Sequence, residues 1–392
     1  MAATLAITSI THYIKHNKNY TALQKQTPIQ PSVYSHTDSP SSGLSDSPLP
    51  KSLGYYFPAE FAPHTATWLS WPHKEASWPG KIHTIFPKYA EFIKYLSLGE
   101  KVRINVADEA MKAFALSHIT AAGADLANVE FYFHPTNDAW CRDHGPAFLI
   151  NPNAEQKKAI VDWDYNAWGG KYPPYDLDDV IPTLIGKHFN LPVFYPGIIM
   201  EGGSVEFNGA GTLMTSTACL LNPNRNPSLN QQQIETFLMD FYGVDQVLWV
   251  DEGIVGDDTD GHIDDTVRFV NEDTVITVVE EKAADENYAL LQHNLKQLNQ
   301  MRLPNGKQLN IVELPMPDDV IYNDQRLPAS YANFYISNKH VIVPTFRSPK
   351  DDKALQIIAG CFNNREVVGI DSTDIIWGLG SFHCLSQQEP AV

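Results

Sequence analysis

Predicted helices and strands alternate along this chain from Phe57 onward, and this alternation limits its fold more than any other feature. Apolar residues recur at helical spacing in six segments, 83–97, 107–121, 176–188, 230–242, 285–301 and 351–362. Short apolar runs typical of strands cover 101–106, 129–133, 266–270, 274–279 and 340–345, and the runs on either side of Asn271–Asp273 predict a hairpin. We expect an α/β fold of small sheets that each carry a helix, although the repetition is too faint for these units to be counted.

Residues 1–53 differ in composition from the rest of the chain. They are rich in Ser, Thr, Pro and Gln, contain only Asp38 and Asp46 as acidic residues, and lack arginine. This composition predicts disorder, with a targeting segment as the alternative, although transit peptides usually carry arginines. No linker interrupts the remainder, and hydrophobic residues make up 43% of the 392-residue chain. We therefore expect a single domain over 54–392 and a cytoplasmic location, with organellar targeting left open.

Charge and cysteine content disfavour several classes of protein. The formal net charge is −18 at pH 7, which disfavours nucleic acid as a partner and favours attraction of a small cationic molecule. No apolar run approaches the roughly 20 residues of a membrane-spanning helix, so no membrane partner is expected. The four cysteines show no C-x-x-C spacing, which predicts neither a disulfide framework nor a zinc site.

Cys384 stands apart from the other cysteines because small and polar residues surround it. It lies in Gly378–Pro390, where glycines allow a close approach of the backbone to a ligand and hydroxyl and amide groups supply hydrogen bonds. No apolar stripe marks it as a core residue. A thiol in this setting is a candidate nucleophile, provided that a histidine and carboxylates elsewhere in the chain support it.

Two acidic segments supply such partners. In Gly256–Asp265, His262 and Asp264 should point the same way, because alternate side chains share a face of an extended segment. An exposed acidic loop and a calcium loop are the alternatives, although the closing glutamate of a calcium loop is missing. The second segment is Trp140–Pro146, in which Arg142 and Asp143 could form a structural ion pair instead.

A third segment, Met200–Glu206, places Glu201 before two glycines at the start of a strand, which by itself predicts only a turn into a hairpin. In combination, the three segments and Cys384 offer one thiol, one imidazole and several carboxylates, each beside a glycine-rich bend. Paired carboxylates match the fork geometry of a guanidinium group. The set therefore suits a cysteine hydrolase that acts on a delocalised cation.

Eight motifs between Phe57 and the C-terminus carry a family resemblance. They are FPAEFAPHTATWLSWP (57–72), WCRDHGP (140–146), NAWGGKYPPYDLDD (166–179), EGGS (201–204), CLLNPNRNP (219–227), TDGHIDD (259–265), LPASYANFYISNKHVIVP (327–344) and FHCLSQQEP (382–390). With these motifs, in this order, the chain resembles the agmatine deiminases and the bacterial peptidylarginine deiminases of the guanidino-group-modifying superfamily.

The resemblance implies a role for each matching residue. Cys384 would attack the guanidinium carbon, and His262 would act as general acid and then as general base. Asp143 and Asp264 would hold the guanidinium nitrogens, and Glu201 would orient His262 or Asp143. Further substrate contacts are expected from Asp258, Asn333, Trp140 and Trp78.

The resemblance also implies a five-bladed pseudo-symmetric α/β propeller of ββαβ-type repeats, with a central active site. No cofactor or metal is expected, and a homodimer is possible by analogy. The chain departs from the Gly-Gly-Gly-Asn that often precedes the nucleophile segment, because Leu379 and Ser381 stand there. His144 stands where Thr or Ser is frequent, and it could face either the ligand or the turn.

The implied reaction is hydrolysis of agmatine to N-carbamoylputrescine and ammonia through an amidino-cysteine intermediate, in putrescine biosynthesis. One alternative is deimination of another guanidine, such as peptidyl arginine. A second is a metal-dependent ureohydrolase built on the Asp and His cluster, which would release urea. A third is a polyamine-binding protein without turnover.

Overall fold

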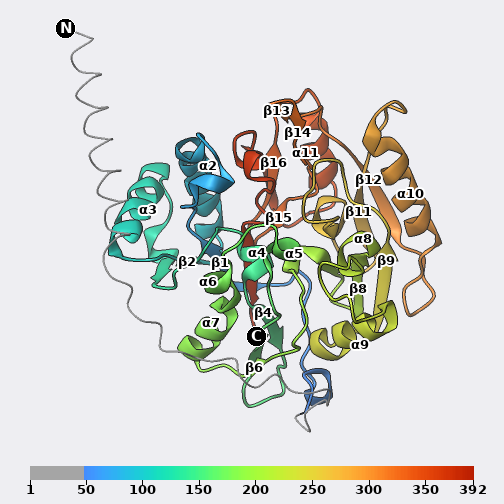
Figure 1. The fold of residues 1–392 in the computed structure, drawn as a ribbon, viewed down its shortest axis with the longest axis horizontal. Coiled ribbons are helices and arrows are strands. Elements are labelled where there is room, and N and C mark those ends of the chain that lie inside the picture. Colours follow the sequence, from blue (N-terminus) through green and yellow to red (C-terminus); the bar gives the residue numbers. More distant parts are fainter. Residues whose placement is uncertain (1–47) are drawn as a thin grey trace. The chain divides into compact units, whose positions relative to one another are not determined.

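Five small sheets repeat one strand pattern, in which an antiparallel pair is followed by a third, parallel strand (Figure 1). In one of them, β10 (Val267–Phe269) pairs antiparallel with β11 (Thr274–Val279), and β11 pairs parallel with β12 (Asn310–Pro315). Helix α10 (Glu286–Gln300) connects β11 to β12. A parallel connection needs such a crossover, which explains the alternation of helices and strands in the sequence. The predicted hairpin is the β10–β11 pair.

The other sheets follow the same plan. Their strands are β4 (Ala147–Ile150), β5 (Lys158–Val161) and β6 (Val193–Phe194); β7 (Val205–Phe207), β8 (Thr212–Ser216) and β9 (Gln246–Val250); β15 (Tyr335–Ile336), β16 (His340–Thr345) and β17 (Glu366–Asp371); and β1 (His64–Ser70), β2 (Lys101–Asn105), β3 (Val129–Tyr132) and β18 (Ser386–Pro390). A separate two-stranded hairpin joins β13 (Ile321–Tyr322) to β14 (Gln325–Arg326). No sheet within residues 48–392 closes on itself, so the structure confirms a mixed α/β fold of several small sheets.

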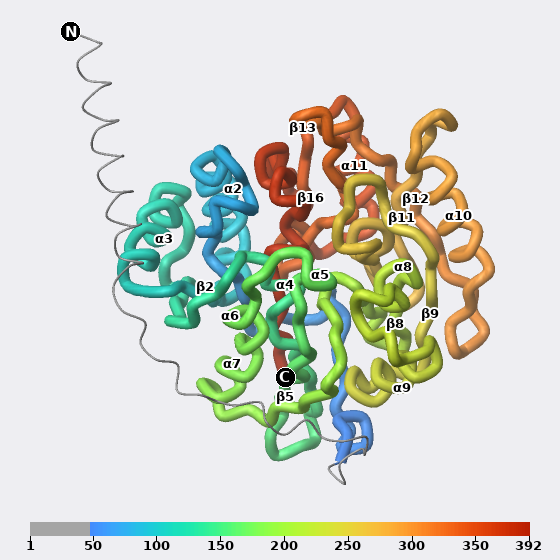
Figure 2. The backbone as a smooth tube through the Cα atoms, in the orientation of Figure 1, coloured from blue at the N-terminus to red at the C-terminus, as the bar shows by residue number. Residues whose placement is uncertain are grey.

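The first sheet is completed by the C-terminal strand. β18 pairs antiparallel with β1, with Thr67 opposite Gln388, and β1 pairs parallel with β2. Figure 2 shows this C-terminal segment (red) passing through the middle of the ribbon beside α4 (Cys141–His144) and β4. The segment that carries Cys384 therefore lies at the centre of the molecule.

The predicted helices are present, with one interrupted. They are α2 (Ile82–Ser97), α3 (Glu109–Ala122), α9 (Gln231–Tyr242), α10, α11 (Asp351–Ala359), and the 176–188 segment, which divides into α6 (Asp176–Asp179) and α7 (Ile181–Phe189). Helix α9 shows why a local pattern can suffice: Asn230 and Gln233 form a capping box at its start, and Gly243 ends it with φ of 68°. The short helices α5 (Ala167–Gly170) and α8 (Thr217–Leu220) complete the α-helices of the described region.

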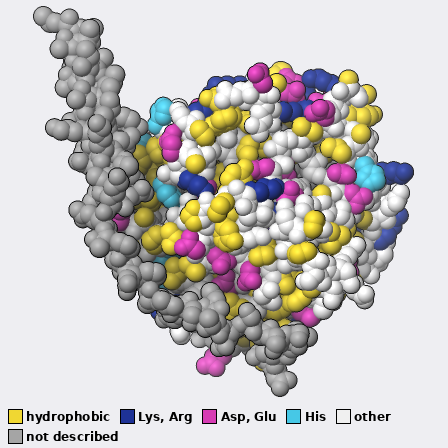
Figure 3. Space-filling view, in the orientation of Figure 1, with side chains coloured by type: hydrophobic (Ala, Val, Ile, Leu, Met, Phe, Trp, Pro, Cys, Tyr) yellow, Lys and Arg dark blue, Asp and Glu magenta, His cyan; other side chains and the backbone are white. Residues whose placement is uncertain are grey.

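The structure is a computed structural model that describes residues 48–392. The predicted extension 1–53 therefore lies outside the described residues except for 48–53, which belong to the same compact unit as the rest of the described chain. There the 3₁₀ turn Lys51–Leu53 places the Lys51 ammonium 2.9 Å from the Asp245 carboxylate. None of the helices between residues 48 and 392 combines the length and apolar composition that crossing a bilayer would require. On the face shown in Figure 3, basic side chains are scattered singly among acidic and uncharged ones.

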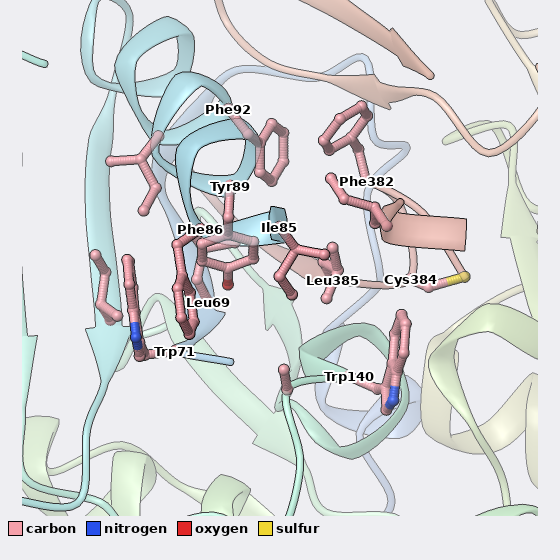
Figure 4. Packing of buried hydrophobic residues seen from close by; sticks show 14 of the residues in the cluster. Leu69, Trp71, Ile85, Phe86, Tyr89, Phe92, Trp140, Phe382, Cys384 and Leu385 are labelled. Carbon is pink, nitrogen blue, oxygen red and sulfur yellow. The ribbon is translucent and has the colours of Figure 1, made fainter. Parts of the chain in front are cut away.

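The largest apolar cluster extends from α2 to the nucleophile segment. Its members Phe92 and Phe382 have ring centroids 4.9 Å apart, and Leu385 and Cys384 continue the cluster toward Trp140 (Figure 4). Burying several aromatic and aliphatic side chains here contributes roughly 1.5–3 kcal/mol for each fully buried residue. The packing of α2 thereby fixes the backbone on which Cys384 stands.

Candidate active site

Three of the side chains expected in the site meet around Gly203, in the 3₁₀ turn η4 (Gly202–Ser204). A Cβ atom built on Gly203 would lie 2.5 Å from His262 Nδ1, 2.8 Å from Asp143 Oδ1 and 3.1 Å from Asp264 Oδ2. Real Cβ atoms do not approach other atoms so closely, so any other residue at 203 would displace these groups. The glycine of the EGGS motif is required for the convergence of an imidazole and two carboxylates.

The extended conformation expected for the segment containing His262 is wrong. Residues Ile263–Asp265 form the 3₁₀ turn η5, and the preceding loop is folded around the side chain of Asp257. The Asp257 carboxylate accepts hydrogen bonds from the backbone N–H groups of Thr259, Gly261 and His262. These bonds replace strand pairing, but His262 and Asp264 still face the same site.

Asp143 is held by two donors from distant segments. Gly203 donates its backbone N–H to Oδ1 at 3.0 Å, and Trp168 donates its indole N–H to Oδ2 at 3.0 Å. Burial raises the pKa of Asp143 to about 6, with Asp264 and Glu201 adding to the rise and His262 opposing it. The backbone of Trp168 is in the left-handed region, with φ of 57°.

His262 lies between two carboxylates. Its Nδ1 is 3.7 Å from Asp143 Oδ1, and its Nε2 is 3.9 Å from Glu201 Oε2. Burial opposes the charged imidazolium, but Asp143, Cys219 and Glu201 together outweigh it and raise the pKa of His262 well above its usual range. The residue is therefore protonated at neutral pH and can serve as a general acid.

Arg225 was missed by the sequence analysis. Its guanidinium donates to Glu201 Oε1 at 2.6 Å, to Asp260 Oδ2 at 2.6 Å and to the carbonyl oxygen of Thr259 at 2.8 Å. These bonds tie the EGGS motif to the loop that carries His262. The position of Glu201 beside His262 thus depends on a cation that lies in the Cys219–Pro227 motif.

Cys384 is more buried than its sequence context predicts. Only 5% of the residue is exposed, and it packs against the apolar cluster that contains Trp140, Phe382 and Leu385. The polar neighbours in sequence point elsewhere, since Ser381 bonds to Ser372. The expectation that Cys384 lies outside a core is therefore wrong, although its sulfur still reaches a pocket.

Asn333 connects the nucleophile to its backbone, in agreement with its expected place in the site. Its Nδ2 lies 2.9 Å from Cys384 Sγ and 2.9 Å from Asp265 Oδ1. Its Oδ1 accepts the backbone N–H groups of His383 and Cys384 at 3.1 and 3.3 Å. Asp264 Oδ2 lies 3.5 Å from the same sulfur. The amide of Asn333 thus fixes where the sulfur points.

Cys384 and Asp143 line a pocket of about 240 Å³, while His262 and Asp264 lie directly behind them and are fully buried. The remaining walls are aromatic, acidic and glycine-rich; they include Trp140, Trp168, Tyr172, Trp377, Asp138, Asp258, Gly378, Leu379 and Gly380. Aromatic walls and acidic groups together suit an organic cation with an apolar chain.

Trp78 does not line this pocket, so its expected contact with the substrate is wrong. It is fully buried, donates its indole N–H to the carbonyl oxygen of Ile375 at 2.9 Å, and stacks behind Trp140 at 5.2 Å between ring centroids. A Cβ atom on Gly378 would lie 2.6 Å from Trp78. Trp78 supports the pocket wall from behind.

Two buried groups offer donor atoms within 4.8 Å of one another, Glu201 with Cys219 and His262, and Asp264 with Asp265 and Cys384. In the first group the Arg225 guanidinium already meets Glu201, and in the second His383 Nδ1 lies 2.6 Å from Asp264 Oδ2. A divalent ion would have to compete with these partners for the carboxylate oxygens. The electrostatics of the site are therefore better matched to a planar guanidinium than to a metal.

The reactivity of the thiol can be predicted from its neighbours. Burial raises the pKa of Cys384 well above its usual range, and Asp264, Asp265 and Asp143 raise it further. We expect iodoacetamide to alkylate the free enzyme slowly at neutral pH and faster as the pH rises. Asp264→Asn removes one negative neighbour and should speed alkylation at neutral pH while it impairs turnover.

Mass spectrometry of the Cys384 peptide measures this labelling without interference from the other cysteines. Rapid alkylation of the wild-type free enzyme at neutral pH would show that the thiol is activated before substrate binds.

Comparison with known proteins agrees with this geometry. A Legionella pneumophila protein named "Putative agmatine deiminase" is 36% identical over 347 residues, which cover 87% of this chain and 96% of that protein. The structure of an agmatine deiminase of Enterococcus faecalis superposes with a TM-score of 0.82 at 29% identity, covering 88% of this chain and 98% of the other. A cysteine-to-serine variant of C. jejuni agmatine deiminase with substrate bound gives a TM-score of 0.77 at 32% identity, covering 86% and 96%.

The match to a family extends over nearly the whole described region. Residues 56–390 fit the family described as Porphyromonas-type peptidyl-arginine deiminase. The motifs noted in the sequence lie within this range, and they supply Cys384, Asp143 and the aromatic residues Trp140, Trp168 and Tyr172 of the pocket. The chain belongs to the Porphyromonas-type peptidyl-arginine deiminase family and is a hydrolase that acts on guanidino groups.

Proposed function

We propose that this enzyme hydrolyses agmatine to N-carbamoylputrescine and ammonia. The observation that carries the proposal is the placement of Cys384 Sγ 3.5 Å from Asp264 Oδ2, at a pocket that Asp143 also lines and beside which His262 lies. The names of its relatives favour agmatine over other guanidines. The five equivalent sheets are consistent with a five-bladed arrangement around this site, which we retain as part of the proposal.

In the proposed first step, Asp143 and Asp264 fix the plane of the guanidinium against the sulfur. Binding of the cation offsets the negative neighbours of Cys384, and the thiol proton is released to solvent. Sγ then bonds to the guanidinium carbon, His262 protonates one departing nitrogen, and the C–N bond breaks to release ammonia. Holding the reactants in line can supply up to roughly 7–11 kcal/mol of the reduction in barrier.

In the second step, water attacks the carbon of the covalent thiouronium. His262, now neutral, accepts one proton of the water, and the other passes to the sulfur as the C–S bond breaks. The product keeps the water oxygen as its ureido carbonyl, and both His262 and the thiol return to their starting states. The aminobutyl chain stays on the substrate throughout. The product places the reaction in a route to putrescine.

Asp258 is the proposed partner of the distal amine of agmatine. Besides Asp143, the carboxylates of Asp138 and Asp258 line the pocket. Asp138 already accepts a hydrogen bond from the Ser77 hydroxyl at 2.5 Å and lies 3.3 Å from the Lys74 ammonium. The Asp258 carboxylate accepts a hydrogen bond from the Tyr172 hydroxyl, and the Lys171 ammonium donates to the Asp258 backbone carbonyl oxygen, whereas no described ion pair places a cation on the carboxylate itself. It is therefore the carboxylate with capacity for a second ammonium.

Steady-state kinetics test both the reaction and this contact. We expect the wild type to release ammonia and no urea from agmatine, and to turn over agmatine faster than arginine peptides. Asp258→Asn should raise KM for agmatine about tenfold or more with a smaller change in kcat, because hydrogen bonds to charged groups contribute roughly 1.5–3 kcal/mol.

Asp138→Asn is the matched control, since it removes a carboxylate of the same pocket that Lys74 already neutralises. Release of urea, inactivation by chelators, or preference for arginine peptides would each identify one of the alternative activities. Equal effects of the two substitutions on KM would dismiss Asp258 as the amine partner.

A further inference from the structure

His383, which precedes the nucleophile, lies between two carboxylates and was not anticipated from the sequence. Its Nδ1 is 2.6 Å from Asp264 Oδ2, and its Nε2 is 2.8 Å from Glu60 Oε2. The imidazole side chain is only 1% exposed. An ionised carboxylate can only accept hydrogen bonds, so both ring nitrogens must donate. With both carboxylates ionised, this geometry corresponds to an imidazolium one residue from Cys384.

Glu60, which contacts His383 Nε2, is itself held by several buried donors. Glu60 accepts hydrogen bonds from Arg142 at 2.9 Å, from Arg268 at 2.9 Å and from the backbone N–H of Ile336 at 2.8 Å. Arg142 also donates to the carbonyl oxygen of His383 at 3.3 Å, and Glu206 pairs with Arg268 at 3.0 Å. These groups are buried and cross-linked, so the far end of the imidazolium cannot move.

The two carboxylate oxygens of Asp264 differ in their contacts. Oδ2 is occupied by His383 and lies near Cys384 Sγ, whereas Oδ1 is buried without a hydrogen-bond partner among the described residues. A buried acceptor without a partner is costly unless a ligand satisfies it. Burial opposes ionisation of Asp264, but His383 outweighs it and keeps the pKa of this carboxyl below its usual range.

We propose that His383 is a positioning residue that carries a proton on both ring nitrogens. Its hydrogen bond to Oδ2 fixes the orientation of the Asp264 carboxylate, so that Oδ1 remains available to bind the guanidinium. The proposal rests on the proposed function, because it assigns the free oxygen to the substrate. Its effect on the reaction is exerted through Asp264 alone. If His383 were purely structural, it would stabilise the fold through its contact with Glu60 and would not affect the reaction through Asp264. Substitutions that keep one contact and remove the other distinguish these two roles.

Two amide substitutions separate them. The side-chain amide nitrogen of Asn lies near the position of histidine Nδ1, so His383→Asn can keep the hydrogen bond to Asp264. The amide nitrogen of Gln lies near the position of Nε2, so His383→Gln can keep the hydrogen bond to Glu60. We expect kcat/KM for agmatine to be about tenfold or more higher in His383→Asn than in His383→Gln, because the bond kept involves a charged group. We expect Tm to follow the opposite order.

Equal kcat/KM values, or a higher value in His383→Gln, would overturn the positioning role. A shared loss of folding, seen as loss of the thermal transition in both variants, would leave the decision to a second measurement on the wild type. That measurement is the ¹⁵N spectrum of the histidine side chains in the free wild-type protein, assigned through correlations to its own labelled backbone.

We expect two protonated nitrogens for His383 at neutral pH. His144 provides the contrast in the same spectrum, since burial lowers its pKa to about 3 and neither ring nitrogen has a hydrogen-bond partner within residues 48–392. An unprotonated nitrogen on His383 would refute the proposal. Because this spectrum requires no turnover, it remains decisive even if agmatine proves not to be the substrate.

Discussion

Cys384→Ser is expected to lower kcat for agmatine at least about 10³-fold while leaving agmatine binding measurable. A serine hydroxyl is a far weaker acid than a thiol, and the carboxylates of Asp264 and Asp143 would oppose the alkoxide even more strongly than the thiolate. The groups that hold the guanidinium remain in this variant. Binding measured by calorimetry should therefore survive the loss of turnover.

The covalent intermediate gives this prediction a direct readout. Acid quenching of the wild type during turnover should leave an amidino group bearing the aminobutyl chain on the Cys384 peptide, and mass spectrometry detects it. Cys361→Ser is the control, because that half-buried thiol contacts the carbonyl oxygen of Ile357 at 3.6 Å, outside the site. If Cys384→Ser kept more than a few per cent of wild-type kcat, the sulfur would not be the nucleophile.

His262→Ala should reduce kcat by roughly 10²–10⁴-fold, the usual contribution of a general acid and base. The loss acts on both steps, since the same imidazole protonates ammonia and later activates water. Because the pKa of His262 is raised in the free enzyme, the imidazolium is present at neutral pH, and its acid role is lost only as the pH rises through that raised value. Single-turnover experiments with quenching separate slow formation of the adduct from slow breakdown.

His134→Ala is a suitable control for removal of a buried imidazole. His134 contacts Asn105 at 3.1 Å, and burial lowers its pKa to about 4, so it is neutral at pH 7, and it is not among the residues that line the pocket. Its substitution should affect Tm more than kcat. A similar loss of kcat in both variants would indicate that His262 acts by packing rather than by proton transfer.

The chemical groups of the site were predictable from the motifs and the family resemblance, whereas their supports were not. Cys384, His262, Asp143, Glu201 and Asn333 lie in glycine-rich or motif-bearing segments and converge as expected. The missed supports are Arg225, Trp168, His383 and Glu60, which act through hydrogen bonds between segments far apart in the chain. No periodicity or motif reports such a contact, because it exists only after the sheets have assembled.

The long helices were predictable for the opposite reason. Helix α2 has a buried face with helical periodicity, and α9 has its own capping box. Short strands such as β7 carry too few residues for an alternating pattern, and β8 is buried along its whole length. The error at His262 arose because hydrogen bonds to the Asp257 carboxylate replaced strand pairing.

The pairing of β1 with β18 has a consequence for folding kinetics. Four of the repeated sheets draw their antiparallel pair from neighbouring stretches, but this one joins Thr67 to Gln388 across almost the whole described chain. Contacts of long sequence separation slow folding, because loop closure must be offset before such contacts stabilise the chain. We therefore expect the β1–β18 pairing to form late in folding and the Cys384 thiol to react with electrophiles more readily during refolding than in the folded enzyme.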